Sequence, residues 1–277
     1  MRNRFALAAI VVAALVAGSA RIGAITYGFI DTTNTYRNTG AFIVKSPTTG
    51  NIYPICSGTL IGAGVFLTAS HCTAYFEQVL APLGYVAFVS FDNPIPFGSL
   101  TTNTTGLIAV TGMVTNPNFT VAQNDSGDIA VILVNAADTS GITPATLPAA
   151  GLLTGLRAAK ALDGVPFTSV GYGLQNRVVG GGVPYFQDVN PIPRMFSFST
   201  FNALNPTYLR LSQNPATGNG GTCFGDSGGP QFLVVGGVRT IVSITITGDS
   251  VCRATNVAYR LDTESARTFL SPFVPLP

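Results

Sequence analysis

The stretch "GGTCFGDSGGP", Gly220–Pro230, places five glycines around a single serine, Ser227. Glycine has no Cβ, so its backbone N–H group can approach a ligand closely and its φ angle can be positive. A serine among such donors is a candidate nucleophile, because backbone N–H groups can bind the oxyanion formed when it attacks a carbonyl. A glycine-rich surface turn is the alternative interpretation, so the motif needs support from the rest of the chain.

The composition indicates a soluble, turn-rich β protein. A chain of 277 residues is long enough for one large domain or two modest ones. Hydrophobic residues make up 47% and charged residues 9%, with 31 glycines and 18 prolines, which excludes a disordered chain and argues against a helical bundle. After position 25 no apolar run reaches the ~20 residues that a membrane-spanning helix needs.

The N-terminus has the pattern of an export signal. Arg2 and Arg4 precede the apolar run Phe5–Ala17, which is short for a membrane span and is followed by small residues. We therefore expect residues 1–24 to be a signal peptide and the protein to be secreted. Loss of Arg2, Arg4 and Arg21 leaves 11 basic against 12 acidic residues, a net charge of −1. Such a chain has no electrostatic reason to bind nucleic acid or, after signal cleavage, a membrane.

The four cysteines predict two disulfides, since the chain is expected to be exported. Three connectivities are possible, and pairing within each half of the chain is the simplest. A zinc site is the alternative, but the chain has no C-x-x-C spacing and only one histidine.

Short runs rich in Val, Ile, Phe and Thr, separated by Gly, Pro, Asn and Asp, predict antiparallel strands in two β units. The segment 136–156 is interpreted as the connector between these units. One helix is expected near the end of the chain, over about 263–270, with Asp262 as its N-cap. The predicted strands are "AFIVKS", "GVFLTAS", "YVAFVSF", "LIAVTGMV", "DIAVILV", "FTSVGYG", "RMFSFSTF", "YLRLS", "QFLVVGGV" and "TIVSITIT".

A serine nucleophile needs a base to accept its proton and a group that orients that base. His71 is the only histidine and lies beside Cys72 at the end of an apolar strand, so any serine–histidine mechanism must use it. Asp128 stands directly before the apolar run "IAVILV", where burial can hold its carboxylate against an imidazole. Asp125 is the alternative, but it lies among turn residues and is expected to be solvated.

The motifs "TASHC" (Thr68–Cys72), "DIAVILV" (Asp128–Val134) and "GDSGGP" (Gly225–Pro230) together resemble the trypsin/chymotrypsin-like serine proteases. Their order of His, Asp and Ser matches that family, whereas subtilisin-like and α/β-hydrolase enzymes use other orders. The resemblance covers about residues 25–270 and includes "CSGTLI", "VGYG" and "YRLD" at Cys56–Ile61, Val170–Gly173 and Tyr259–Asp262.

This resemblance implies an all-β protein of two antiparallel six-stranded β-barrels with a short C-terminal helix. The first barrel would span about 25–140 and the second about 152–277. The implied disulfides are Cys56–Cys72 and Cys223–Cys252.

The resemblance also implies a site in the cleft between the barrels. Its catalytic triad would consist of His71, Asp128 and Ser227, and the N–H groups of Gly225 and Ser227 would form the oxyanion hole. The family usually carries Ser-Trp-Gly on the strand that binds substrate backbone. This chain has no tryptophan and has "ITITGD", ending at Asp249, in that place. The interval between the triad residues also indicates an insertion around residues 92–106.

In this family the residue six positions before the nucleophile lies at the base of the primary pocket, and an aspartate there selects Lys or Arg. Here it is Gly221, with Thr222 beside it and Gly248 and Asn256 as expected wall residues. A buried substrate cation would then be uncompensated, so the resemblance implies a preference for uncharged residues, with large apolar ones ahead of basic ones. Asp249 would alter this preference if it turned inward.

Family members commonly become active when a new N-terminal Ile or Val folds inward and its ammonium pairs with the aspartate before the nucleophile, here Asp226. Cleavage after Ala24 would expose Ile25 for this role, while cleavage after Ala20 would leave four residues to be trimmed. An arginine that neutralises Asp226 internally is the alternative. A buried carboxylate needs one such partner, because an unpaired buried charge is costly.

We therefore expect a secreted serine endopeptidase that works through an acyl-enzyme, without metal or cofactor. Its partners would be polypeptide substrates and protein inhibitors, and the protein would be a monomer. One alternative is a catalytically silent secreted binding protein on the same fold, although such proteins usually lose a triad residue. The other is an unrelated secreted β-sandwich adhesion module, which would have no reason to carry these motifs.

Overall fold

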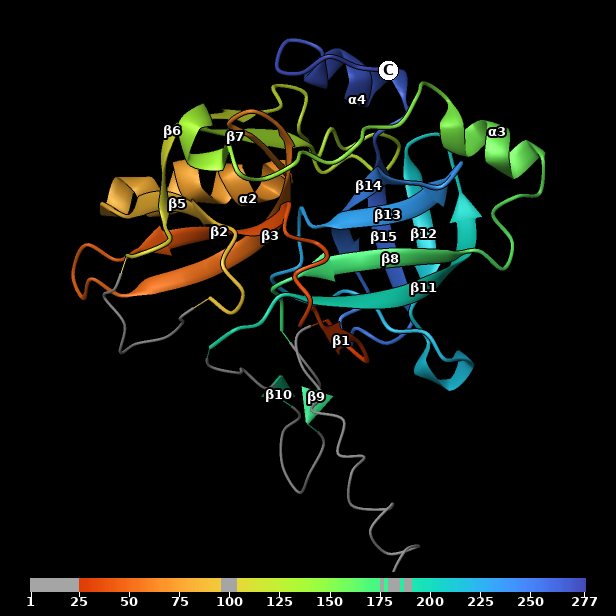
Figure 1. The fold of residues 1–277 in the computed structure, drawn as a ribbon, viewed down its shortest axis with the longest axis horizontal. Coiled ribbons are helices and arrows are strands. Elements are labelled where there is room, and N and C mark those ends of the chain that lie inside the picture. Colours follow the sequence, from red (N-terminus) through yellow and green to blue (C-terminus); the bar gives the residue numbers. More distant parts are fainter. Residues whose placement is uncertain (1–24, 96–103, 175–176, 179–184, 187–190) are drawn as a thin grey trace, which may run out of the picture.

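The structure is a computed structural model that describes residues 25–95, 104–174, 177–178, 185–186 and 191–277. The expected signal peptide, residues 1–24, lies outside the described residues, as does the middle of the insertion expected around residues 92–106. Two β-barrels lie side by side, and the chain completes the first before it begins most of the second (Figure 1).

The first barrel is closed by six antiparallel strands in the order β2-β3-β4-β7-β6-β5. Register shifts in several strand pairs bend the strands around the barrel. Its strands are β2 (Thr39–Lys45), β3 (Ile52–Gly62), β4 (Val65–Thr68), β5 (Val86–Ser90), β6 (Ile108–Thr115) and β7 (Ala130–Val134).

The second barrel is closed in the order β8-β11-β12-β15-β14-β13, with β8 pairing both β11 and β13, and the short strand β1 (Phe29–Ile30) adds to β11. The prediction of two antiparallel six-stranded barrels is therefore confirmed. Its strands are β8 (Pro166–Gly171), β11 (Met195–Leu204), β12 (Tyr208–Ser212), β13 (Pro230–Val235), β14 (Val238–Gly248) and β15 (Thr255–Arg260), and a separate hairpin pairs β9 (Arg177–Val178) with β10 (Tyr185–Phe186).

The helices are short and include two that the sequence analysis did not predict. Helix α2 (Ser70–Tyr75) follows β4, and α3 (Leu152–Ala158) lies partly within the segment interpreted as a connector. The expected C-terminal helix is α4 (Glu264–Leu270), but its N-cap is Thr263, whose side chain accepts from the Ala266 N–H. Asp262 was expected in that role and instead pairs with Arg260. The remaining turns are η1 (Phe76–Leu80), η2 (Ala81–Leu83), η3 (Ala136–Thr139) and η4 (Pro215–Thr217).

The barrels share a continuous core, which explains why β7 is apolar on both faces. Ile132 and Val134 pack inside the first barrel, while Val131 belongs to a cluster that also holds Phe232 and Tyr259 of the second barrel. Helix α4 contributes to this shared cluster and lies above the junction of the barrels (Figure 1). Within the described residues, no helix is long and apolar enough to cross a bilayer.

Candidate active site

His71 is held where β4 passes into helix α2. The chain turns there because Ala69 is extended and Ser70 begins the helix, with the Ser70 hydroxyl bonded to the Ile129 carbonyl at 2.7 Å. The Cys56–Cys72 disulfide ties the same turn to β3, and Cys223–Cys252 is the second disulfide. Both pairings match those that the family resemblance implies. The His71 backbone is therefore constrained on both sides.

Asp128 lies two residues before β7 and forms two hydrogen bonds with His71. One carboxylate oxygen accepts from the His71 backbone N–H at 2.9 Å, and the other contacts Nδ1 at 2.8 Å. A carboxylate can only accept, so Nδ1 carries a proton, and in the neutral imidazole Nε2 is then the acceptor. Asp128 is 6% exposed, in keeping with the burial expected from its sequence position. The competing Asp125 instead accepts from the Gly127 N–H and the Tyr259 hydroxyl.

Ser227 lies opposite this pair, in a loop of the second barrel. It lines a pocket of about 250 Å³ together with His71. Its carbonyl accepts from the Ser57 N–H of β3 at 2.9 Å, so the loop is bonded directly to the first barrel. The structure thus pairs His71 with Asp128 and places His71 on a pocket that Ser227 also lines.

The peptide before Gly225 is oriented by a bond from the Leu174 N–H to the Phe224 carbonyl, at 2.6 Å. In a trans peptide the N–H points opposite to the carbonyl, so the Gly225 N–H points away from Leu174. Gly225 has φ of +92°, and a Cβ there would lie 2.9 Å from the Gly173 Cα. Neither Gly225 N–H nor Ser227 N–H donates to another residue in the part of the chain that the structure describes. Two donors are therefore available to a ligand.

Comparison with known protein families assigns the chain to one of them. The family model described as Trypsin matches residues 29–267, which is most of the chain. The chain belongs to the trypsin family. A comparison with curated proteins finds no match.

In this trypsin-family chain the expected pocket residues divide into two groups. Thr222 and Gly248 line the pocket beside Ser227, whereas Gly221 and Asn256 are buried and do not line it. A Cβ at position 221 would overlap the side chain of Gln213. The Gln213 amide therefore occupies the space that a longer side chain at 221 would need.

Gln213 was not singled out by the sequence analysis, and no local motif marks it. Its carbonyl oxygen accepts from the Thr222 N–H at 2.9 Å, and its amide donates to Asp249 at 3.3 Å. Besides His71, Thr222, Ser227 and Gly248, the pocket is lined by Cys223, Phe224, Thr245, Ile246, Thr247, Asp249 and Cys252.

Asp249 lines the pocket as an ionised group engaged by its own loop. Burial opposes its ionisation, but bonds from the N–H groups of Arg253, Thr255 and Ala254 outweigh burial and hold the pKa below its usual value. These bonds and the one from Gln213 stabilise the carboxylate, which keeps its negative charge.

Cys56, His71 and Cys72 bring potential metal-ligand atoms within 4.8 Å of one another. The two sulfurs are joined in a disulfide, however, and only a thiolate is a good metal ligand. This group of residues therefore gives no support to the zinc alternative.

Asp226 is fully buried beneath the Ser227 loop. Its two oxygens accept from the N–H groups of Gly173 at 2.8 Å and Cys223 at 2.9 Å. Burial raises its pKa to about 7, and the two N–H bonds only partly oppose this effect. Asp226 forms no ion pair with any residue that the structure describes.

The raised pKa of Asp226 predicts a pH-dependent stability in a chain that retains Ala24. Between the unfolded pKa near 4 and the folded pKa near 7, the folded state binds the extra proton, so stability falls as pH rises through this range. The loss is on the order of 4 kcal/mol by conversion of the pKa difference. Urea unfolding at several pH values should show this slope, and Asp226→Asn should lack it. Parallel curves for the two proteins would contradict the assignment.

Proposed function

We propose that the protein is a serine endopeptidase in which Ser227 is the nucleophile, His71 the general base and Asp128 the group that orients it. The observation that carries this proposal is the pair of hydrogen bonds between the buried Asp128 carboxylate and His71, beside a pocket that Ser227 also lines. In such a mechanism the carboxylate selects the tautomer in which Nε2 accepts the serine proton.

The reaction would proceed through an acyl-enzyme. Oγ of Ser227 attacks the peptide carbonyl carbon while His71 Nε2 takes its proton, and the carbonyl oxygen becomes an oxyanion. The N–H groups of Gly225 and Ser227 stabilise that charge. The intermediate then expels the amine, which takes the proton from His71. Water, activated by His71 in the same way, hydrolyses the ester and restores Ser227.

We further propose that the protein is secreted and acts on polypeptides as a monomer, with protein inhibitors as further partners. The two disulfides support secretion, because such bonds persist mainly in oxidising compartments. The mature chain would carry almost no net charge, which supports neither nucleic acid nor an anionic membrane as a partner.

We expect a preference for uncharged substrate residues. Gly221 provides no carboxylate, and the uncharged Gln213 amide occupies the space that a side chain at position 221 would need. The Asp249 carboxylate is committed to loop N–H groups and Gln213. A substrate cation would therefore lose its hydration without gaining a free counter-charge.

We also propose that Asp226 receives the N-terminal ammonium of Ile25 after cleavage behind Ala24. Ile25 is fully buried and packs against Met195, and the next carbonyl, that of Thr26, accepts from the Gly221 N–H at 2.9 Å. The start of the described chain therefore lies beside Gly221, in the segment that leads to Asp226. The buried Arg194 does not serve Asp226 instead, because its ion pair is with Asp31.

The proposed nucleophile predicts covalent labelling at one position. A fluorophosphonate probe should modify the wild-type protein at Ser227, and Ser227→Ala should abolish both labelling and peptide hydrolysis. His71→Ala should lower turnover by several powers of ten. Ser140→Ala, which removes an exposed hydroxyl, is the matched control and should react like wild type. A wild-type protein that resists the probe would favour the silent binding protein.

The pocket predicts that peptides with an uncharged residue before the cleaved bond are hydrolysed at least about tenfold faster than those with Lys or Arg, because cation burial is uncompensated. Measuring kcat/KM on matched peptides tests this. Asp249→Asn should leave the order of preference unchanged. If arginine peptides were preferred, and if Asp249→Asn removed that preference, Asp249 would be the recognition group instead.

The proposed ion pair predicts that activity depends on where the chain begins. N-terminal sequencing of the active secreted protein should find Ile25, and that form should lose the pH slope of stability because an ammonium lowers the pKa of Asp226. A form that retains Ala24 should be much less active. Full activity with Ala24 in place would rule out the pair.

A further inference from the structure

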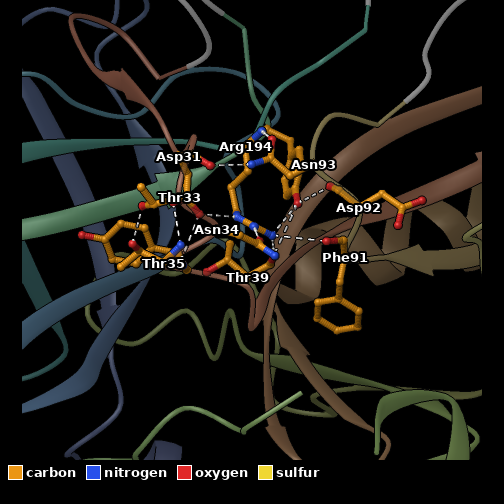
Figure 2. A network of polar contacts seen from close by, with 11 residues as sticks. Asp31, Thr33, Asn34, Thr35, Thr39, Phe91, Asp92, Asn93 and Arg194 are labelled. Atoms are coloured by element: carbon orange, nitrogen blue, oxygen red, sulfur yellow. Dashed lines mark hydrogen bonds and ion pairs between the residues drawn. The ribbon is translucent and has the colours of Figure 1, made fainter. Parts of the chain in front are cut away.

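A buried ion pair lies outside the proposed triad and the proposed pair of Ile25 with Asp226. The side chains of Arg194 and Asp31 are fully buried, and Nε of Arg194 contacts an Asp31 oxygen at 2.9 Å. Burying two charges carries a large desolvation cost, which only good geometry and further hydrogen bonds offset. Figure 2 shows that this guanidinium is surrounded by such bonds.

The guanidinium joins three parts of the molecule. Nη1 donates to the Thr39 and Phe91 carbonyls of the first barrel, at 3.1 and 3.3 Å, and Nη2 donates to Asn34 in the N-terminal segment. Asp31 in turn accepts from the N–H groups of Thr35 and Tyr36 at 2.7 and 3.0 Å. Arg194 itself directly precedes β11 of the second barrel.

The same Nη1 donates at 3.1 Å to the hydroxyl of Tyr172, which is 3% exposed and donates to the Asp92 carbonyl at 2.8 Å. Burial raises the pKa of Tyr172, so the phenol keeps its proton for this bond. The Tyr172 side chain is thus held at its tip between the first barrel and Arg194.

The backbone that starts at Tyr172 contacts the loop Phe224–Asp226, directly through two N–H groups and indirectly, by way of Ser57, through a third. We call Tyr172–Leu174 the strap. The Tyr172 N–H donates at 3.0 Å to Oγ of Ser57, which donates to the Gly225 carbonyl at 2.9 Å. The next two N–H groups donate to Asp226 and to the Phe224 carbonyl. The strap therefore bonds the peptide that carries the Gly225 N–H directly, and it reaches the following peptide, at the Gly225 carbonyl, through Ser57.

We propose that Arg194, oriented by Asp31, is a positioning residue that fixes the strap through Tyr172 and so sets the oxyanion donors. The inference rests on the proposed peptidase function. Oxyanion donors act on charge that is present only in the transition state, so their displacement lowers kcat rather than raising KM. Arg194 touches no substrate in this scheme.

Two variants test the link. Arg194→Met removes the charge, and Tyr172→Phe removes only the hydroxyl while keeping the ring and the ion pair. Both should lower kcat by about tenfold to a hundredfold with KM nearly unchanged, as expected for slight misplacement of catalytic groups. Their effects should not add in the double variant, because both act through one contact.

The chain offers a matched control in a second buried ion pair. Arg260 contacts Asp262 at 2.8 Å, with both side chains at most 5% exposed, in the second barrel away from the strap. Arg260→Met should lower stability much as Arg194→Met does, but kcat of the folded enzyme should stay within about twofold of wild type. Equal kcat losses in the two arginine variants, or unchanged kcat in Tyr172→Phe, would overturn the proposal.

Amide hydrogen exchange tests the strap without any turnover. The Gly173 and Leu174 amide hydrogens should exchange about tenfold faster in Tyr172→Phe than in wild type or Arg260→Met, because their acceptors are less well held. Unchanged exchange would overturn the proposal. If the wild type failed to hydrolyse peptides while exchange changed as expected, the peptidase function would be wrong and the positioning role would stand.

Discussion

The candidate site depends on how the two barrels are held against each other. His71 and Asp128 belong to the first barrel and Ser227 to the second, so neither barrel contains the site alone. The Ser57 N–H bonds the Ser227 carbonyl directly across this junction, at 2.9 Å. The apolar cluster shared by the two barrels keeps one barrel from sliding past the other, since close-packed side chains leave few alternative arrangements.

Buried ionisable groups are handled in two different ways. Arg194 and Asp31 neutralise each other, as do Arg260 and Asp262, each within a set of hydrogen bonds. Asp226 has only backbone N–H partners among the described residues, and burial raises its pKa to about 7. The two ion pairs are complete as they stand. Asp226 has no such partner among the described residues, so a cation added beside it would stabilise its charged form.

Local pattern was enough to predict ten of the twelve barrel strands, because apolar runs of this length bury a face in any barrel. The run that became β3 was interpreted only as a motif, because Pro54 and two glycines interrupt its alternation, and β15 was likewise not predicted as a strand. Helix α3 begins within the segment 136–156, which was interpreted as a connector because it contains several Gly and Pro residues. Its Leu153 packs into the second barrel's core, a contact that local pattern does not reveal.

The sequence by itself determined the family and the residues selected for the site, since "TASHC" and "GDSGGP" specify local turns that few other structures need. Only the tertiary structure decided which other residues surround them. Gln213, directly after β12, bonds Thr222 and Asp249, which line the pocket. Arg194 meets Asp31 across 163 positions of the chain. Such contacts arise from the closure of two barrels, and no local spacing encodes where a closed sheet brings distant side chains together.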